Sequence, residues 1–224
     1  MKPVTSRPME AVGRVVVVIL LVASLAGYVV SEIRSDRLKA RIREQAYTMQ
    51  PGDIPANGLV FGIQIVGSND FRLQVARALL LLKLGDLETF SRVTNTIGIV
   101  REDSRTVASV TKKPPLVKMS PKTAFYSLTW CVAGLVHEAR HIELARRRGE
   151  TNPIPSIVIY PAKPRGYKDF QRDELDCVAL QLRVLKKLGA PPHELESSRF
   201  QDGTHFDVNR DGKWDAEDQR LQKW

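Results

Sequence analysis

Hydrophobic residues recur with helical spacing along two long stretches of the C-terminal half of the chain. The first stretch predicts a helix over 121–148, with Ser120 as its N-cap and Gly149 just past its end. Its apolar positions are Phe125, Leu128, Val132, Leu135, Val136 and Ile142. The second stretch predicts a helix over 168–188, closed by Gly189 and followed by a short helical segment from 191 to about 198.

The residues before these helices predict strands alternating with shorter helices. We expect strands over 59–66, 98–100 and 106–111, and a further short strand over 156–160. A helix over 70–84 is apolar nearly all round and should be buried, and Asp86 should cap a short helix in which Phe90 and Val93 face inward. The Lys-Lys-Pro-Pro segment at 112–115 should interrupt the chain before the first long helix. The pattern therefore predicts an α+β fold with a small mixed sheet packed on the long helix.

An unbroken apolar run occupies 15–30 and follows the basic residues Lys2, Arg7 and Arg14. It is read either as an uncleaved signal anchor or as a secretory signal cleaved after Ser24-Leu25-Ala26, and the apolar residues beyond Ala26 favour the anchor. Both readings place the rest of the chain outside the cytoplasm. The basic residues after the run oppose this, because the positive-inside rule favours the other orientation; they are Arg34, Arg37, Lys39, Arg41 and Arg43. We expect an anchor or signal over 1–30, a stalk over 31–50, a main domain over 51–200 and a C-terminal loop over 201–224.

The first long helix carries a His-Glu-x-x-His motif at His137, Glu138 and His141. On a helix the two histidines lie one turn apart on the same face, where both can bind one zinc ion. The motif resembles that of the zincin metallopeptidases, so the resemblance implies a zincin-like fold, a Zn²⁺ cofactor and a peptide or protein substrate. In that family, the glutamate at the position of Glu138 is the general base towards the zinc-activated water.

A catalytic zinc site needs a third protein ligand. The metzincin extension is absent, because Leu144 stands where its glycine would be. The gluzincin pattern takes a glutamate from a following helix instead, and Glu174 is the residue that matches it, with Asp173 and Asp176 as alternatives. Cys131 lies two turns before Glu138 on the same helix face, and Cys177 lies one turn after Glu174. If both helices converge on one metal, the two cysteines approach each other, and we expect a disulfide between them in an extracytoplasmic compartment.

The C-terminal residues predict a calcium-binding loop that resembles an EF-hand and, more closely, a dockerin loop. Its ligands would be Asp207, Asn209, Asp211, the Lys213 carbonyl, Asp215 and Asp218, with Gly212 at the sharp turn. A single such loop suggests a structural role, in which Ca²⁺ fastens the C-terminus onto the domain.

The net charge of +9 is spread over several short clusters without interleaved aromatic residues, which indicates a solvated basic surface and no nucleic-acid partner. The sequence thus predicts an extracytoplasmic zinc metallopeptidase, either held at the membrane by its N-terminal helix or secreted after cleavage near Ala26. The alternative is a non-catalytic cell-surface binding module with structural zinc and calcium sites.

Overall fold

The computed structural model describes residues 8–149, 166–204, 207–213 and 216–221; the side chains of 8–23, 26, 216, 219 and 220 lie outside the description. The chain divides into two compact units, Met1–Arg41 and Ile42–Trp224. Helix α1 spans Pro8–Tyr47, and its last residues belong to the second unit, where Ala46 is fully buried. The globular unit therefore begins before the boundary at residue 51 that the sequence predicts.

The predicted membrane segment over 15–30 falls largely on side chains outside the description. Among the described residues, no helix is both long and apolar enough to cross a membrane. The short strand expected over 156–160 also lies outside the described residues.

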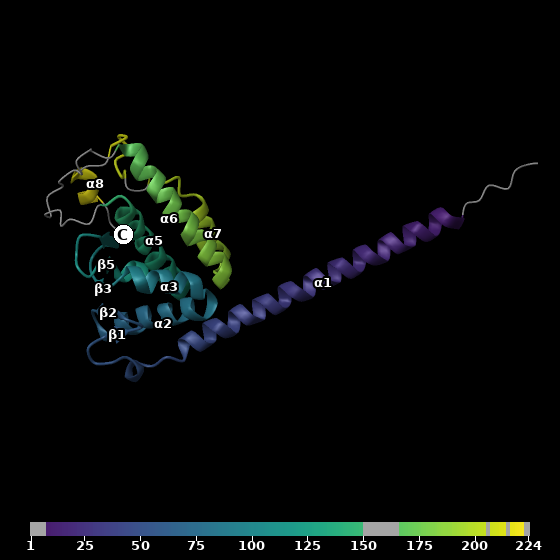
Figure 1. Ribbon diagram of the computed structural model, residues 1–224, viewed down its shortest axis with the longest axis horizontal. Helices are drawn as coiled ribbons and strands as arrows, with labels where there is room; N and C mark the ends of the chain where they lie inside the picture. Colours follow the sequence, from purple (N-terminus) through teal and green to yellow (C-terminus); the bar gives the residue numbers. More distant parts are fainter. Residues whose placement is uncertain (1–7, 150–165, 205–206, 214–215, 222–224) are drawn as a thin grey trace, which may run out of the picture. The chain divides into compact units, whose positions relative to one another are not determined.

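The described residues of the second unit form an α+β fold around a five-stranded mixed sheet with the order β1-β2-β3-β5-β4 (Figure 1). Strands β2, β3 and β5 are parallel, and β1 and β4 pair antiparallel at the two edges. The strands are β1 (Leu59–Val60), β2 (Ile63–Val66), β3 (Ile99–Glu102), β4 (Val107–Ser109) and β5 (Leu116–Met119). The helices are η1 (Pro51–Asp53), α2 (Asn69–Gly85), α3 (Leu87–Thr96), α4 (Pro121–Ala124), α5 (Leu128–Arg147), α6 (Tyr167–Leu188), α7 (Pro192–Arg199) and α8 (Ala216–Leu221). The α+β prediction is confirmed.

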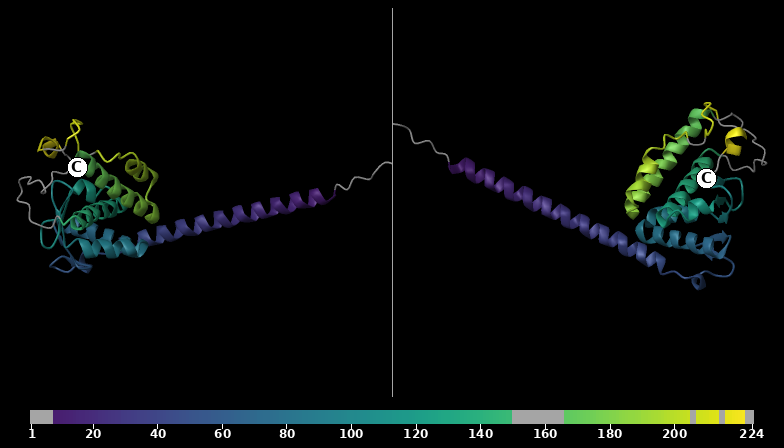
Figure 2. Two further views of the ribbon diagram at one scale, coloured as in Figure 1. Left: turned by 45° about the horizontal axis from the view of Figure 1, so that its top comes forward. Right: turned by 180° about the vertical axis from the view of Figure 1, so that it is seen from behind.

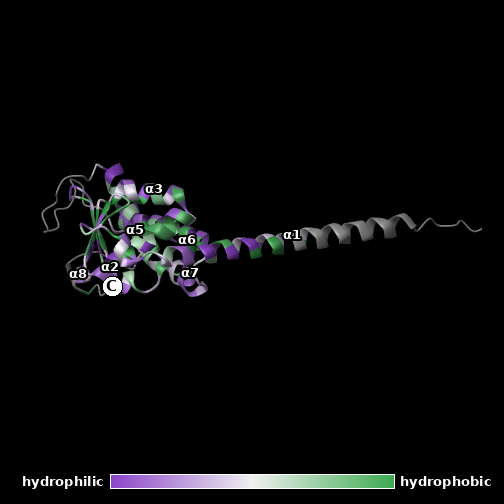
Figure 3. Cartoon of the chain, turned by 90° about the horizontal axis from the view of Figure 1, so that it is seen from below, coloured by the Kyte–Doolittle hydropathy of each residue, from purple (hydrophilic) through white to green (hydrophobic). Residues whose placement is uncertain are grey.

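Helix α5 occupies the centre of the unit and contacts β4 and β5 as well as α2, α3 and α6. Helices α5 and α6 lie side by side in both orientations of Figure 2. Hydrophobic residues gather along the strands and on α5, where they form the core (Figure 3). Helix α2 is buried as predicted, with Phe71, Leu79 and Leu82 inaccessible to solvent.

The segment predicted as one strand over 59–66 is instead a tight hairpin of β1 and β2. Val60 pairs with Ile63, so Phe61 and Gly62 form a two-residue loop. Both have positive φ angles, 50° and 83°, as the favoured hairpin turn requires. The prediction of a single strand is wrong because apolar Phe61 conceals the turn in the sequence.

The helix predicted over 121–148 is broken at 125–127. Helix α4 ends at Ala124, and α5 begins after Ser127, whose hydroxyl accepts a hydrogen bond from the Trp130 amide at 2.9 Å. Phe125 was expected on the buried face but is 46% exposed. Strand β5 was missed, because its four residues follow the Lys-Lys-Pro-Pro segment and are too few to show a period.

Asp86 ties the corner between α2 and α3 to the C-terminal part of α6. It is almost fully buried, and its carboxylate accepts hydrogen bonds from the Thr89 hydroxyl at 2.8 Å and the Lys187 ammonium at 2.8 Å. Burial alone would raise the pKa of Asp86, but the hydrogen bonds from Lys187 and Thr89 hold it below its ordinary value. The ionised carboxylate therefore stabilises the fold and helps to fix α6.

Asp86→Asn should keep the helix cap, since asparagine caps as well as aspartate, but lose the charge. The difference in unfolding free energy between wild type and Asp86→Asn should be largest above about pH 3.9, the pKa of aspartate in the unfolded chain. It should shrink as the pH falls through the lower pKa of Asp86 in the folded protein. Urea unfolding of both proteins between neutral pH and strongly acidic pH measures this difference. A difference that stays constant over the whole range would contradict the assignment.

Candidate metal centre

Two neighbouring helices bring the predicted ligands together. His137 and His141 lie on the face of α5 that packs against α6, and their Nε2 atoms are 3.0 Å apart. From α6, the Glu174 carboxylate places one oxygen 3.2 Å from His137 Nε2 and the other 3.1 Å from His141 Nε2. Three donor groups therefore converge on one point.

The spacing of these donor groups fits a small cation. A tetrahedral zinc ion with bonds of about 2.0–2.1 Å holds its ligand atoms about 3.3–3.4 Å apart. The separations of 3.0, 3.1 and 3.2 Å are close to that value. Two imidazoles and one carboxylate are also ligands that zinc prefers.

The orientation of His137 is set by a buried amide. Its Nδ1 lies 3.0 Å from the Gln181 side-chain oxygen, while the Gln181 amide nitrogen donates to the Ser198 hydroxyl on α7, also at 3.0 Å. An amide oxygen can only accept, so the hydrogen of the neutral imidazole lies on Nδ1. His137 Nε2 then directs its lone pair towards Glu174 and His141. Lone pairs that face a carboxylate require a positive charge between them, either a proton or a metal ion.

The surroundings of His141 also favour a positive charge at this position. Burial alone would lower the pKa of His141, but Cys177 and Glu174 raise it well above its ordinary value. The negative charge of the site therefore favours a cation at this position.

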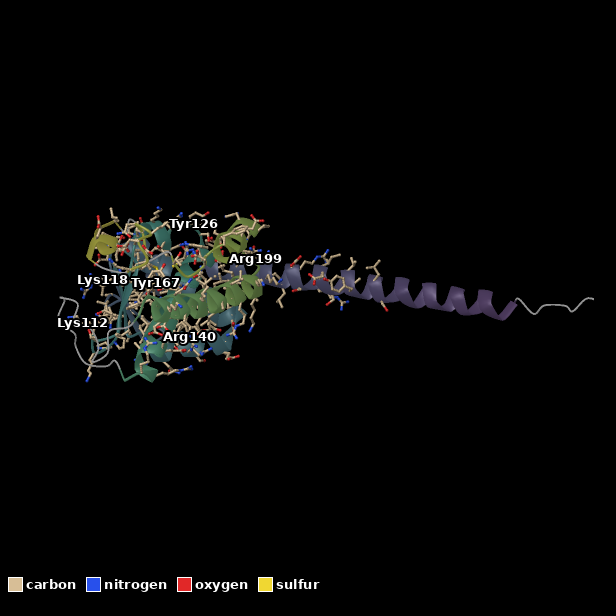
Figure 4. The ribbon with its side chains drawn as sticks, turned by 90° about the horizontal axis from the view of Figure 1, so that it is seen from above. Lys112, Lys118, Tyr126, Arg140, Tyr167 and Arg199 are labelled. Carbon is tan, nitrogen blue, oxygen red and sulfur yellow. The ribbon has the colours of Figure 1, made fainter. Side chains whose placement is uncertain are left out.

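Of the three acidic candidates for the third ligand, two form ion pairs with arginines and one lies against the histidines. Arg140 binds Asp176 at 2.6 Å, and Arg148 binds Asp173 at 2.8 Å. Both arginines belong to α5 or its C-cap, and Arg140 is labelled beside α6 in Figure 4. Asp173 and Asp176 therefore fasten α6 to α5 on either side of Glu174, and only the glutamate is brought to the histidines.

The predicted disulfide is wrong, because both cysteines are free thiols. Cys131 Sγ contacts Met119 Sδ at 3.9 Å in the core, where burial raises the pKa of the thiol to about 12. Cys177 instead lies against His141, which is about 15 Å further along the α5 axis. Disulfides need Cα atoms roughly 4.4–6.8 Å apart, so the two residues are too far separated.

Cys177 lies beside His137 and His141. The sequence did not predict this position for Cys177. Ligand atoms of His137, His141 and Cys177 all lie within 4.8 Å of one another. Burial raises the pKa of the Cys177 thiol, His141 opposes that rise, and the charges of Glu174 and Glu138 add to it. His137, His141 and Cys177 thus form a cluster whose ligand atoms lie close enough together to hold a metal ion.

Glu138 follows His137 on α5 and is 8% exposed. Its charge acts on Cys177, so the carboxylate lies near the cluster. Within the described part of the chain, neither a hydrogen bond nor an ion pair engages it, in contrast to nearby Glu143, which Arg92 and Arg140 both bind. The carboxylate is therefore available to a reacting molecule.

A hydrolase at this site would need a hydrogen-bond donor for the oxyanion besides the metal, and the candidates in flanking segments are His193, His205, Tyr160 and Tyr167. His193 packs against the Tyr126 ring near the start of α5, away from the cluster. Tyr167 hydrogen-bonds Asp207 of the C-terminal loop. Tyr160 and His205 lie outside the described residues.

The C-terminal loop is folded around its own acidic side chains. Asp207 accepts hydrogen bonds from the amides of Asp211 and Gly212 at 3.1 and 3.0 Å, and Asp218 accepts from the amides of Val208 and Asn209 at 2.8 and 3.3 Å. Gly212 has a φ of 77°, as the predicted sharp turn requires. The predicted ligand Asp215 lies outside the described residues; the other ligand positions are Asn209, Asp211 and Lys213, all exposed to some degree.

Comparison with protein-family models, curated proteins and solved structures found no match.

Gln181→Leu should lower the zinc affinity about 10–100-fold, because His137 loses the acceptor that fixes its Nδ1 hydrogen. Ser198→Ala should act in the same direction with a smaller effect. Competition with a chromophoric chelator measures the affinity.

Gln171→Leu is the matched control on the same helix, since its amide donates to the Asp202 carbonyl and does not reach the histidines. Zinc affinity in Gln181→Leu equal to that of the wild type, with the fold intact by circular dichroism, would contradict the role of Gln181.

Proposed function

We propose that the chain is a zinc-dependent peptide hydrolase. The observation that supports this most directly is the convergence of His137, His141 and Glu174, whose ligand atoms are 3.0–3.2 Å apart. His137, His141 and Glu174 would hold the ion. Bound zinc supplies a Lewis acid and lowers the pKa of water to near neutrality.

Glu138 is the proposed general base. It stands beside His137, is nearly buried and lacks an engaging partner among the described residues. Its carboxylate would accept a proton from the attacking water and return that proton to the leaving amine. The His141 side chain is 24% exposed among the described residues, which supports access of a substrate to the site.

The edge strand β4 is the proposed binding place for the peptide. Among the described strands it pairs with β5 alone, and it packs against α5, the helix that bears the histidines. An edge strand presents unpaired main-chain groups, to which an extended peptide can add as a further strand.

Glu138→Gln should reduce peptide hydrolysis by about 10²–10⁴-fold while zinc content and melting temperature stay unchanged, because the substitution keeps the shape and removes the base. Both proteins should be screened against a broad peptide library in the presence of zinc. Glu143→Gln is the matched control, since Glu143 lies on the same helix but is held by arginines, and it should retain hydrolysis.

Cleavage that survives in Glu138→Gln would refute the mechanism. Zinc binding without hydrolysis by the wild type would favour the alternative, a non-catalytic binding module with a structural zinc site.

We also propose that the C-terminal loop binds calcium. Asp207 and Asp218 are both buried, at 5% and 0% exposure. Their carboxylates face the same stretch of backbone. A divalent cation would neutralise these charges. The hydrogen bond from Tyr167, the first residue of α6, to Asp207 connects the loop to the helix that carries Glu174. Such a site fits the proposed extracytoplasmic location, where calcium is abundant enough to fill low-affinity sites.

Calcium should raise the melting temperature, with a stabilisation of about 2.7 kcal/mol at a concentration one hundred times the dissociation constant. Asp207→Ala and Asp211→Ala should remove this shift. Asp202→Ala is the control, because its carboxylate bonds Thr204 outside the proposed ligand set, and it should keep the shift. A shift that persists in Asp207→Ala would place the calcium elsewhere.

A further inference from the structure

Cys177 lies on the same face of α6 as the residues that meet the histidines. It follows Glu174 by three positions and precedes Gln181 by four, so the three side chains are stacked along one side of the helix. Glu174 and Gln181 both contact the histidine rings directly. The Cys177 sulfur, between them, is within 4.8 Å of a ring nitrogen of each histidine.

The other cysteine shows what an ordinary buried thiol looks like in this protein. Cys131 packs against Met119 among apolar core residues and behaves as a small hydrophobic side chain. Cys177 is equally inaccessible, but it is absent from that core cluster and lies near the ring nitrogens of His137 and His141. Apolar packing therefore does not account for its position.

We infer that Cys177 is a fourth protein ligand for the metal ion that His137, His141 and Glu174 hold. The inference rests on the proposed zinc site. Thiolate sulfur is a preferred ligand of zinc, with a bond of about 2.3 Å. On binding, the S–H bond breaks, the proton passes to water, and the sulfur donates an electron pair to the ion.

A fourth protein ligand would change how many coordination positions of the metal are left for water. Four protein donors complete a tetrahedral coordination sphere and leave no position for water, whereas a catalytic zinc site keeps one position open. With four protein ligands the centre would be closed, and hydrolysis would require the Cys177 sulfur to give up its position to a water molecule.

Cobalt(II) substitution of the full-length protein tests the inference by spectroscopy. Sulfur ligation gives a near-ultraviolet thiolate-to-cobalt charge-transfer band, and tetrahedral coordination gives intense visible bands. Wild type and the matched control Cys131→Ala should show both. Cys177→Ala should lose the charge-transfer band and keep bound cobalt through the remaining three ligands.

A charge-transfer band that persists in Cys177→Ala, or its absence from cobalt-loaded wild type, would overturn the inference and leave the proposed three-ligand site intact. Failure of the wild type to bind cobalt or zinc would overturn both. X-ray absorption at the zinc edge of the wild type needs no variant. It should find one sulfur neighbour at about 2.3 Å, and a shell of nitrogen and oxygen alone would contradict the inference.

Discussion

The packing of α5 against α6 is the constraint on which the candidate site depends. The two helices run antiparallel, since His137 meets Gln181 while His141 meets Glu174. Arg140 and Arg148 fasten α6 to this side of α5 by binding the aspartates that flank Glu174. These ion pairs fit a register between the helices in which Glu174, Cys177 and Gln181 of α6 face the histidines.

The two proposed cation sites share helix α6. Its first residue, Tyr167, bonds Asp207 in the C-terminal loop, and the Gln171 amide bonds the carbonyl of Asp202 just before that loop. Further along, the same helix presents Glu174, Cys177 and Gln181 to α5. Calcium bound in the loop would thus hold the start of the helix that supplies the metal ligands, so the structural site would support the chemical one.

The sequence predicted the features that depend on local spacing. The boundaries of α2, α6 and α7, the cap that begins α3 and the histidine pair follow from periodicity, capping residues and a short motif, whereas Glu174 was expected from the gluzincin resemblance. Features set by tertiary contacts were missed. The Phe61 turn and the Ser127 break are concealed by apolar neighbours, and the partners of Cys131 and Cys177 depend on which faces of the helices meet. The free thiols also remove the disulfide as an argument for an extracytoplasmic location, which the N-terminal segment and the calcium loop still favour.

The central claim is that α5 and α6 together bind one metal ion, and the metal content of the purified protein tests it most directly. Elemental analysis after equilibration with limiting zinc should find about one zinc per chain in the wild type. The double variant His137→Ala, His141→Ala should contain none, with its melting behaviour checked in parallel. Stoichiometric zinc in the folded double variant, or none in the wild type, would contradict the account.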